Sequence, residues 1–186
     1  MKLMIQNIIK NTFFVFLMSL MTAWPVSQAF ANEPLFSDFN NKPHKLEEYF
    51  GHDRWTVFLI WASDCGICNK EVSNYIDFNF KHRDGLAQVI GISIDGQAKK
   101  TEAIKFIERH DVDFQNLLVE PDRMARWFEY LTGQNWVGTP TILIYTPEGE
   151  LQAQQAGAVP VELLEKFIRR SAENNKARIK TTTVTH

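Results

Sequence analysis

Cysteine is scarce in this chain, because Cys65 and Cys68 are the only two among its 186 residues. A scaffold of structural disulfides is therefore excluded, since the one available bond closes a very short loop and contributes little to stability. A zinc site is disfavoured as well, because the five histidines show no H-x₃₋₅-H spacing and about four ligands are needed. Histidines such as His82 and His110 are expected to be surface groups at helix ends. We predict no metal and no cofactor, and both thiols stay available for chemistry.

The chain also lacks excess positive charge and any long hydrophobic run. Its net charge of −2 disfavours nucleic acid as a partner. The apolar stretch Phe13–Met21 is too short to span a bilayer. It follows Lys2 and Lys10 and precedes the small-x-small site Ala29–Ala31, a pattern typical of a secretory signal peptide over residues 1–31. We therefore expect an exported protein, periplasmic in a Gram-negative source; an uncleaved membrane anchor is the alternative.

The remaining chain shows no internal repeat and no dividing linker. We expect one domain over residues 32–174 and a disordered basic tail over residues 175–186. Apolar and β-branched runs alternate with helical patterns, and an antiparallel pair follows, which predicts an α/β sandwich with a mixed sheet. The expected strands are Leu35–Phe39, Trp55–Trp61, Leu86–Ile94, Phe114–Val119, Thr141–Tyr145 and Glu150–Ala156; the expected helices are Cys65–His82, Ala98–His110, Pro121–Tyr130 and Pro160–Asn174.

The two cysteines form a CxxC motif, Cys65–Cys68, that follows an apolar strand and opens a helical pattern. Thiols at a helix N-terminus face unpaired backbone N–H groups and the positive end of the helix dipole, and both favour the thiolate. This placement indicates a dithiol that opens and closes, the chemistry of a thiol–disulfide oxidoreductase.

Three stretches carry a resemblance to a known family. Trp61–Cys68 follows a core strand, Glu71 lies three residues after the second cysteine, and Gly138–Thr141 precedes another strand. Together they resemble the thioredoxin superfamily, in particular its exported TlpA/ResA-like branch, over Leu35–Arg170. The resemblance implies a thioredoxin-like three-layer α/β/α sandwich and a cis Thr139–Pro140 bond that faces the dithiol. It also implies a membrane thiol-transfer protein as electron donor, and clients such as apocytochromes and other metalloprotein precursors.

The expected catalytic residues are Cys65, Cys68 and Glu71. Cys65, the more exposed thiol, would attack a client disulfide, and Cys68 would displace the product from the mixed disulfide. Glu71 shares a helix face with Cys68, so a partly buried carboxylate there could accept the proton of Cys68. The alternative for Glu71 is an ordinary solvated carboxylate.

Four residues are predicted to bind substrate. The backbone of Thr139 next to Pro140 is expected to pair with an extended client segment. The connection Leu131–Val137 is longer than the resemblance suggests, and its Trp136 either stacks on a client or fills the edge of the core. Trp61 is expected to lie half-buried beside the motif and to shield the disulfide.

Three residues around the thiols depart from the family pattern and are predicted to tune the redox potential: Asp64, Gly66 and Ile67. An acid next to Cys65 opposes thiolate formation and makes the couple more reducing, unless Asp64 points to water. The buried acid that the superfamily carries on the preceding strand has no counterpart in the apolar Phe58–Ile60. We therefore expect a reductase.

Two functions from different classes remain open. The first is an exported enzyme that reduces disulfides in client proteins through Cys65 and Cys68. The second is a redox-inactive module that binds clients through the groove at Pro140. The sequence does not fix the oligomeric state.

Overall fold

The computed structural model describes residues 35–184, with side chains for residues 35–175. The predicted signal peptide, residues 1–31, lies outside the described residues. The elements follow in the order β1 (Phe36–Ser37), β2 (Pro43–His44), η3 (Leu46–Tyr49), β3 (Trp55–Trp61), α2 (Gly66–His82), β4 (Ala87–Ser93), α3 (Lys100–Arg109), β5 (Asn116–Leu118), α4 (Pro121–Thr132), β6 (Thr141–Tyr145), β7 (Leu151–Ala156) and α5 (Val161–Val184).

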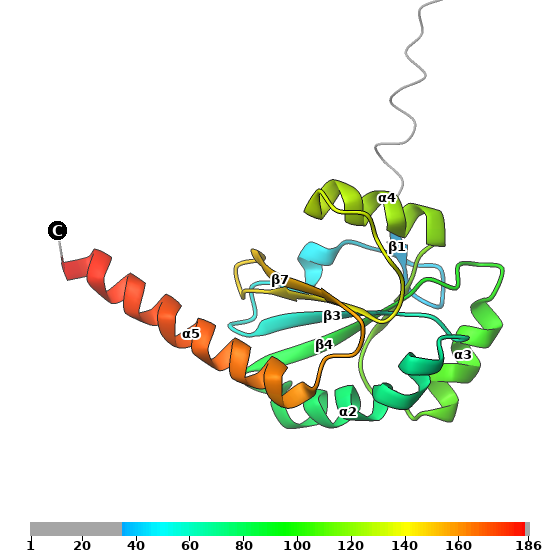
Figure 1. The fold of residues 1–186 in the computed structure, drawn as a ribbon, viewed down its shortest axis with the longest axis horizontal. Coiled ribbons are helices and arrows are strands. Elements are labelled where there is room, and N and C mark those ends of the chain that lie inside the picture. The colour runs from blue at the N-terminus through cyan, green and yellow to red at the C-terminus, as the bar shows by residue number, and fades with distance from the viewer. Residues whose placement is uncertain (1–34, 185–186) are drawn as a thin grey trace, which may run out of the picture. The chain divides into compact units, whose positions relative to one another are not determined.

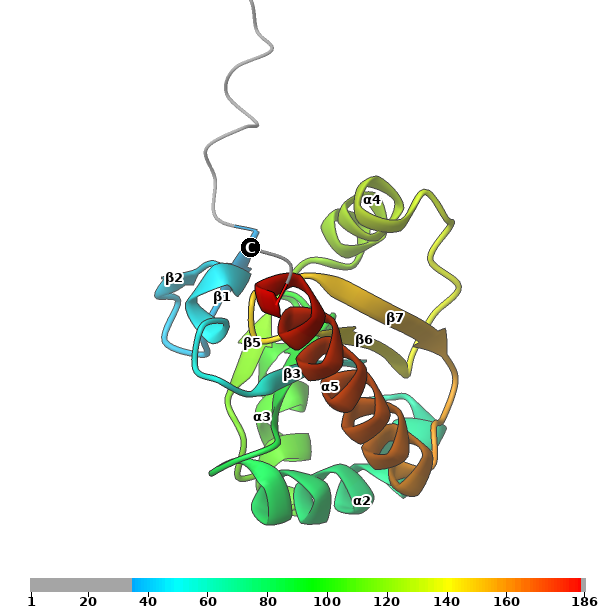
Figure 2. The ribbon, with the colours of Figure 1, turned by 90° about the vertical axis from the view of Figure 1, so that its left-hand side faces the viewer.

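Within the described part of the chain, seven strands form one sheet in the order β2-β1-β5-β4-β3-β6-β7 (Figures 1 and 2). The central strands β3, β4 and β5 are parallel, whereas β6 runs antiparallel to β3, from Thr56 opposite Tyr145 to Ile60 opposite Thr141. Parallel neighbours joined by helical crossovers require helices on the faces of the sheet. The predicted mixed sheet is confirmed.

Helices cover both faces of the sheet. Figures 1 and 2 place α2, α3 and α5 on one side and α4 on the other. Side chains of β3 alternate between two hydrophobic clusters: Val57, Leu59 and Trp61 join the cluster under α2, α3 and α5, and Phe58 and Ile60 join the one under α4. A strand buried on both faces is expected to be mostly apolar, which explains the sequence of β3. The three-layer thioredoxin-like sandwich is thereby confirmed.

The helix that carries the second cysteine is fixed to the sheet by a buried polar contact. Asn79 of α2 is 3% exposed, and its Oδ1 accepts a hydrogen bond from the Val89 backbone N–H of β4 at 2.9 Å. At the end of α2, His82 is also buried, with Nε2 3.1 Å from Glu165 of α5. The expectation of a surface position is therefore wrong for His82, because α5 packs over this end of α2.

The structure departs from the sequence prediction at both ends of the domain. The first strand is short, only Phe36–Ser37, and pairs with a second short strand, Pro43–His44, that the sequence did not suggest. At the other end α5 runs to Val184, so the predicted tail is helical to that residue rather than disordered. The tail contains two lysines, one alanine and one arginine, which are good helix formers, and no glycine or proline stops the helix after Pro160. Among residues 35–184, no helix has both the length and the apolar character needed to cross a bilayer.

Candidate active site at the Cys65–Cys68 disulfide

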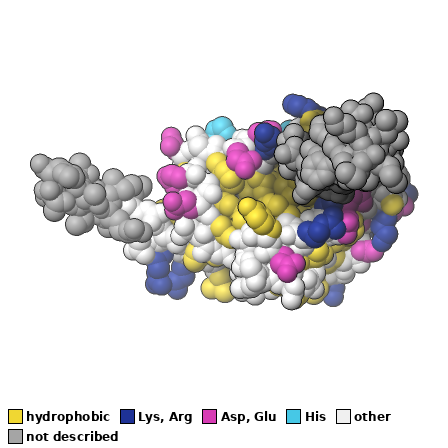
Figure 3. Space-filling view, turned by 90° about the horizontal axis from the view of Figure 1, so that it is seen from above, with side chains coloured by type: hydrophobic (Ala, Val, Ile, Leu, Met, Phe, Trp, Pro, Cys, Tyr) yellow, Lys and Arg dark blue, Asp and Glu magenta, His cyan; other side chains and the backbone are white. Residues whose placement is uncertain are grey.

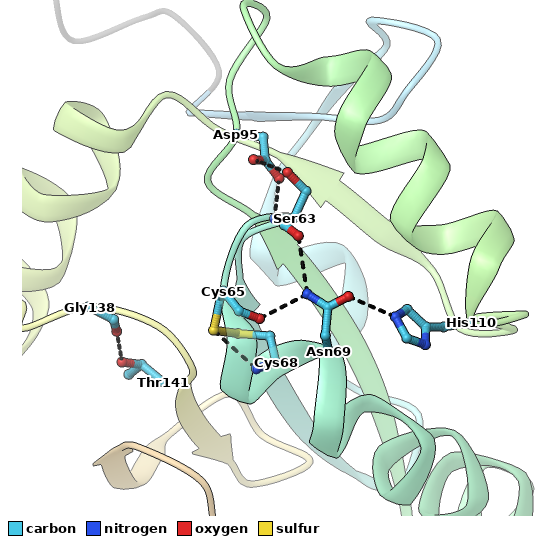
Figure 4. The surroundings of a disulfide bond; sticks show 8 residues. All are labelled: Ser63, Cys65, Cys68, Asn69, Asp95, His110, Gly138 and Thr141. Atoms are coloured by element: carbon cyan, nitrogen blue, oxygen red, sulfur yellow. Dashed lines mark hydrogen bonds between the residues drawn. A yellow bond between two sulfur atoms is a disulfide. The ribbon is translucent and has the colours of Figure 1, made fainter.

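The two cysteines are joined in a disulfide at the start of α2, with their Cα atoms 5.2 Å apart (Figure 4). Cys65 is the N-cap of the helix, and its sulfur accepts a hydrogen bond from the Cys68 backbone N–H at 3.1 Å. Cys68 is 4% exposed, whereas Cys65 is only partly buried. A client can therefore approach Cys65 more readily than Cys68, in the order of exposure that the sequence predicted.

A small, partly enclosed apolar cavity of about 10 Å³ lies beside Cys68. Its size suits about one water molecule. Pro140, which follows a cis Thr139–Pro140 bond, lines this cavity together with Cys68, so the two distant motifs meet in space. Pro140 is buried and Thr139 is partly exposed. The remaining lining residues are Leu59, Trp61, Glu71, Val72, Tyr75 and Phe106.

Glu71 is the one carboxylate that lines the cavity. It is partly buried, and its Oε2 accepts a hydrogen bond from Asn74 Nδ2 at 2.9 Å. Burial raises the pKa of the Tyr75 phenol to about 12, and the negative charge of Glu71 adds to that rise. Tyr75 thus stays protonated and donates to the Val159 carbonyl at 3.2 Å. Glu71 shares an apolar cavity with Cys68, the placement that a proton acceptor needs; the proton transfer itself stays a prediction.

Asp64, directly before Cys65, points away from the core and is exposed. Its Oδ2 lies 2.8 Å from Lys99 Nζ, and this hydrogen bond is the main reason that the pKa of Asp64 is below its usual value. The ammonium offsets part of the carboxylate's field at Cys65, so Asp64 opposes the thiolate less than the sequence alone suggests. Gly66 and Ile67 are exposed between the cysteines, Ile67 to 49%.

Trp61 is buried, so the sequence prediction of a half-buried position is wrong. Its side chain is 2% exposed and stacks on Phe106 with ring centroids 4.3 Å apart. Its indole N–H donates to Asn116 Oδ1 at 3.0 Å. The nearby Gly91 leaves room for this pair, because a Cβ there would collide with the Asn116 amide. Trp61 is therefore a buried residue that lines the cavity beside Cys68.

Trp136 fills the edge of the core, one of the two positions that the sequence left open. Its side chain is partly buried and packs against the cluster under α4, and its indole nitrogen is shielded from solvent without a hydrogen-bond partner. The exposed apolar side chains of this region are Val137, at 78%, and Tyr130, at 90%. Hydrophobic side chains gather on the face seen from the α4 side (Figure 3).

A buried acid beside the motif escaped the sequence analysis. Asp95, just after β4, is 6% exposed and accepts hydrogen bonds from the Ser63 N–H at 3.0 Å and the Ser63 hydroxyl at 2.8 Å. The Ser93 hydroxyl also donates to Asp95, at 2.7 Å. The carboxyl ends of parallel strands meet at one edge of a sheet, so an acid after β4 was the available signal. Asp95 thus holds the loop before Cys65 through Ser63.

The sequence analysis also missed a second polar contact of the loop before Cys65. Asn69 of α2 donates from Nδ2 to the carbonyls of Cys65, at 2.9 Å, and Ser63, at 3.2 Å (Figure 4). Its Oδ1 lies 3.0 Å from Nε2 of His110, which is therefore tied to the active site rather than free at a helix end. Within the described residues, no group of three or more His, Cys, Asp or Glu side chains gathers as a metal site would require.

This geometry defines a class of protein: a thioredoxin-like fold with a CxxC redox centre of the thiol–disulfide oxidoreductase type. A family profile described as "AhpC/TSA family" matches residues 28–154, so the chain belongs to the AhpC/TSA family. A search of curated proteins gave no match.

Solved structures share the fold at low sequence identity. A domain of a possible thiol-disulfide isomerase from Cytophaga hutchinsonii has a TM-score of 0.62 at 19% identity and covers 77% of this chain and 90% of its own. A thioredoxin-related protein from Neisseria meningitidis serogroup B has a TM-score of 0.61 at 18% identity, covering 74% and 98%. The thioredoxin domain of a thiol-disulfide oxidoreductase from Bacteroides vulgatus has a TM-score of 0.57 at 22% identity, covering 71% and 90%.

Proposed function

We propose that this protein is an exported thiol–disulfide oxidoreductase of the TlpA/ResA-like kind that reduces disulfides in other exported proteins. The observation that carries the proposal is the asymmetry of the disulfide: Cys65 is accessible at the N-cap of α2, while Cys68 lies in an apolar cavity with Glu71 and Pro140. The solved relatives described as thiol-disulfide oxidoreductase or isomerase support the same reaction class.

The reaction proceeds in two exchanges. In the reduced protein, the Cys65 thiolate attacks one sulfur of a client disulfide, which forms a mixed disulfide and releases the first client thiolate. Glu71 accepts the proton of Cys68, and the resulting thiolate attacks the Cys65 sulfur. The intramolecular disulfide forms, the second client thiolate leaves and takes up a proton, and two electrons have passed to the client.

The surroundings of Cys68 favour the reducing direction. A thiolate in an apolar cavity lacks hydration, and the carboxylate of Glu71 adds a like charge. Both effects destabilise the reduced, ionised centre relative to the neutral disulfide, which makes the couple a better electron donor. Asp64 contributes less than the sequence suggests, because Lys99 pairs with it.

Clients would bind across the disulfide. The partly exposed Thr139, beside the buried Pro140, offers backbone groups to an extended client segment by strand addition. Exposed Ile67 and Val137 give apolar contacts near this segment of chain. Apocytochromes and other metalloprotein precursors are the proposed clients.

A membrane thiol-transfer protein is the proposed donor that returns the disulfide to the dithiol. Export rests on the signal-peptide pattern of residues 1–31. In a Gram-negative source the protein would work in the periplasm.

Turnover and trapping test the proposal together. The protein, kept reduced by dithiothreitol, should reduce insulin disulfides, and Cys65→Ser should abolish turnover. Cys68→Ser should accumulate mixed disulfides with clients, because Cys65 still attacks and nothing resolves the product. Trapping by Cys65→Ser instead would reverse the two roles. Absence of turnover, with client binding unchanged in Cys65→Ser, would favour a redox-inactive client-binding module at Pro140.

A further inference from the structure

Two residues that neither attack nor bind a client hold the loop that carries Cys65. Asn69 lies one helical turn after Cys65 on α2, and His110 is the C-cap of α3, 41 residues further along the chain. Figure 4 shows the chain of contacts that runs from His110 through Asn69 to the loop beside the disulfide.

The hydrogen-bond pattern fixes the orientation of the Asn69 amide. Its NH₂ group donates both hydrogens to the carbonyls of Ser63 and Cys65, which can only accept. The amide oxygen therefore faces Nε2 of His110 at 3.0 Å, and that nitrogen must carry a hydrogen. The contact needs a donor at this position, and both the Nε2–H tautomer and the imidazolium supply one.

His110 is itself held in place from the core. Its backbone N–H donates to the Phe106 carbonyl at 3.2 Å, and its ring lies 4.7 Å from the Phe106 ring, centroid to centroid. Phe106 in turn stacks on the buried Trp61. The position of the Asn69 oxygen is thus set by a rigid part of the sheet and α3 rather than by a mobile surface group.

One of the carbonyls that Asn69 binds belongs to Cys65, whose sulfur attacks the client disulfide in the proposed reaction. The Cys65 carbonyl receives both the Asn69 side-chain amide at 2.9 Å and the Asn69 backbone N–H at 3.0 Å. This pair keeps Cys65 at φ −76° and ψ 108°, the N-cap conformation in which its sulfur accepts the Cys68 N–H. Asparagine is a poor residue for a helix interior, so its place in α2 carries a helix-propensity cost that these bonds offset.

We infer that Asn69 and His110 are a pair of positioning residues that hold Cys65 in the N-cap conformation and thereby maintain the reactivity of its thiolate. The inference deepens the proposed function, since it concerns the same dithiol. Without the pair, the loop between Ser63 and Cys65 samples other conformations, and the sulfur spends less time at the helix N–H groups that stabilise negative charge.

Alkylation of Cys65 in the reduced protein tests the pair. The rate with iodoacetamide, followed by mass spectrometry of the Cys65 peptide, reports the thiolate fraction as pH is varied. In both Asn69→Ala and His110→Ala we expect the rate at pH 7 to fall by about threefold to tenfold, the equivalent of one lost hydrogen bond. The midpoint of the pH profile should move to higher pH, which a purely structural role would not cause.

The double variant and two controls make the result decisive. If His110 acts through Asn69, the double variant should match Asn69→Ala alone. Asn174→Ala, on the exposed side of α5, and His52→Ala, in an exposed loop, should leave the profile unchanged. Wild-type profiles in both single variants, or effects that add fully in the double variant, would overturn the inference.

Two safeguards keep the test independent of other outcomes. Should Asn69→Ala lose its cooperative thermal transition, His110→Ala alone decides, since a wild-type profile there removes the pair. Both substitutions leave the charged groups near the disulfide in place: Asp64 with Lys99, Asp95 and Glu71. Alkylation needs no client, so a failure to reduce insulin would count against the proposed function without touching this result.

Discussion

Replacing Glu71 with glutamine removes the proposed proton acceptor with little change in shape. The variant keeps one side-chain oxygen, so the hydrogen bond from Asn74 Nδ2 can persist. The cavity beside Cys68 has room for about one water molecule, so in the proposed mechanism the proton would pass from Cys68 to Glu71 directly or through that one molecule. A glutamine side chain cannot accept it.

The size of the effect follows from the exposure of the site. A general base contributes roughly 10²-fold to 10⁴-fold to a rate. Glu71 is only partly buried, and solvent can take part of its role. We therefore expect the lower limit, a fall of about 100-fold at pH 7 in the rate at which Cys68 resolves the mixed disulfide. The deficit should shrink as pH rises, because Cys68 then ionises without help.

A single-turnover experiment isolates this step. The reduced protein is mixed with an excess of an aromatic disulfide, and the release of the first and second aromatic thiols is followed by stopped flow. The first release reports attack by Cys65, and the second reports resolution by Cys68. Glu71→Gln should slow only the second. Asp77→Asn, an exposed carboxylate on the same helix, is the matched control and should change neither. Equal second-phase rates in wild type and Glu71→Gln across the pH range would refute the proton-acceptor role.

Three further predictions concern the surroundings of the site. Lys99→Met leaves the Asp64 carboxylate unpaired next to the thiols. The equilibrium constant for reduction of glutathione disulfide by the protein should therefore rise about twofold to threefold, and added salt should reduce this rise. A fall in the constant would contradict the prediction. Trp61→Ala should lower the free energy of unfolding by about 4 kcal/mol in denaturant titration, because it empties a buried site and leaves the Asn116 amide oxygen without a donor. A loss below about 1 kcal/mol would place the indole outside the core. Hydrogen bonds from Lys81 and Arg169 lower the pKa of Glu165 from 4.5 to about 2. The ionised carboxylate therefore stabilises the fold fully above pH 4.5, and this stabilisation is lost as pH falls toward 2. Glu165→Gln should cost about 1 kcal/mol at pH 7 in thermal unfolding, and the difference from wild type should close near pH 2.

Much of the fold could be predicted because local signals and tertiary structure agree. Trp55–Trp61 is nearly all apolar because both faces of β3 are covered, and Thr141–Tyr145 is mostly apolar for the same reason. The short strand β2 could not be predicted, because two residues, one of them proline, give no periodicity. It forms only because it pairs with β1.

The site was predictable where chemistry lies in the motif and less so where it depends on contacts from other elements. The CxxC pair was found from its spacing and Pro140 from the family resemblance, and the cavity that Cys68 and Pro140 both line agrees with that expectation. Trp61 was misplaced because adjacency to the cysteines says nothing about which face of β3 it occupies. The ion pair of Asp64 with Lys99 joins residues 35 positions apart, and the contact of Asn69 with His110 joins residues 41 apart. Single-sequence periodicity does not register contacts of that range.

The central claim is that Cys65 and Cys68 form a reversible couple poised to donate electrons. Equilibration of the purified mature domain with glutathione buffers, with the two redox forms counted by alkylation and mass, measures its reduction potential directly. The account predicts a value near that of thioredoxin, about −270 mV. A value near that of a strong disulfide-forming oxidant, about −120 mV, would contradict it.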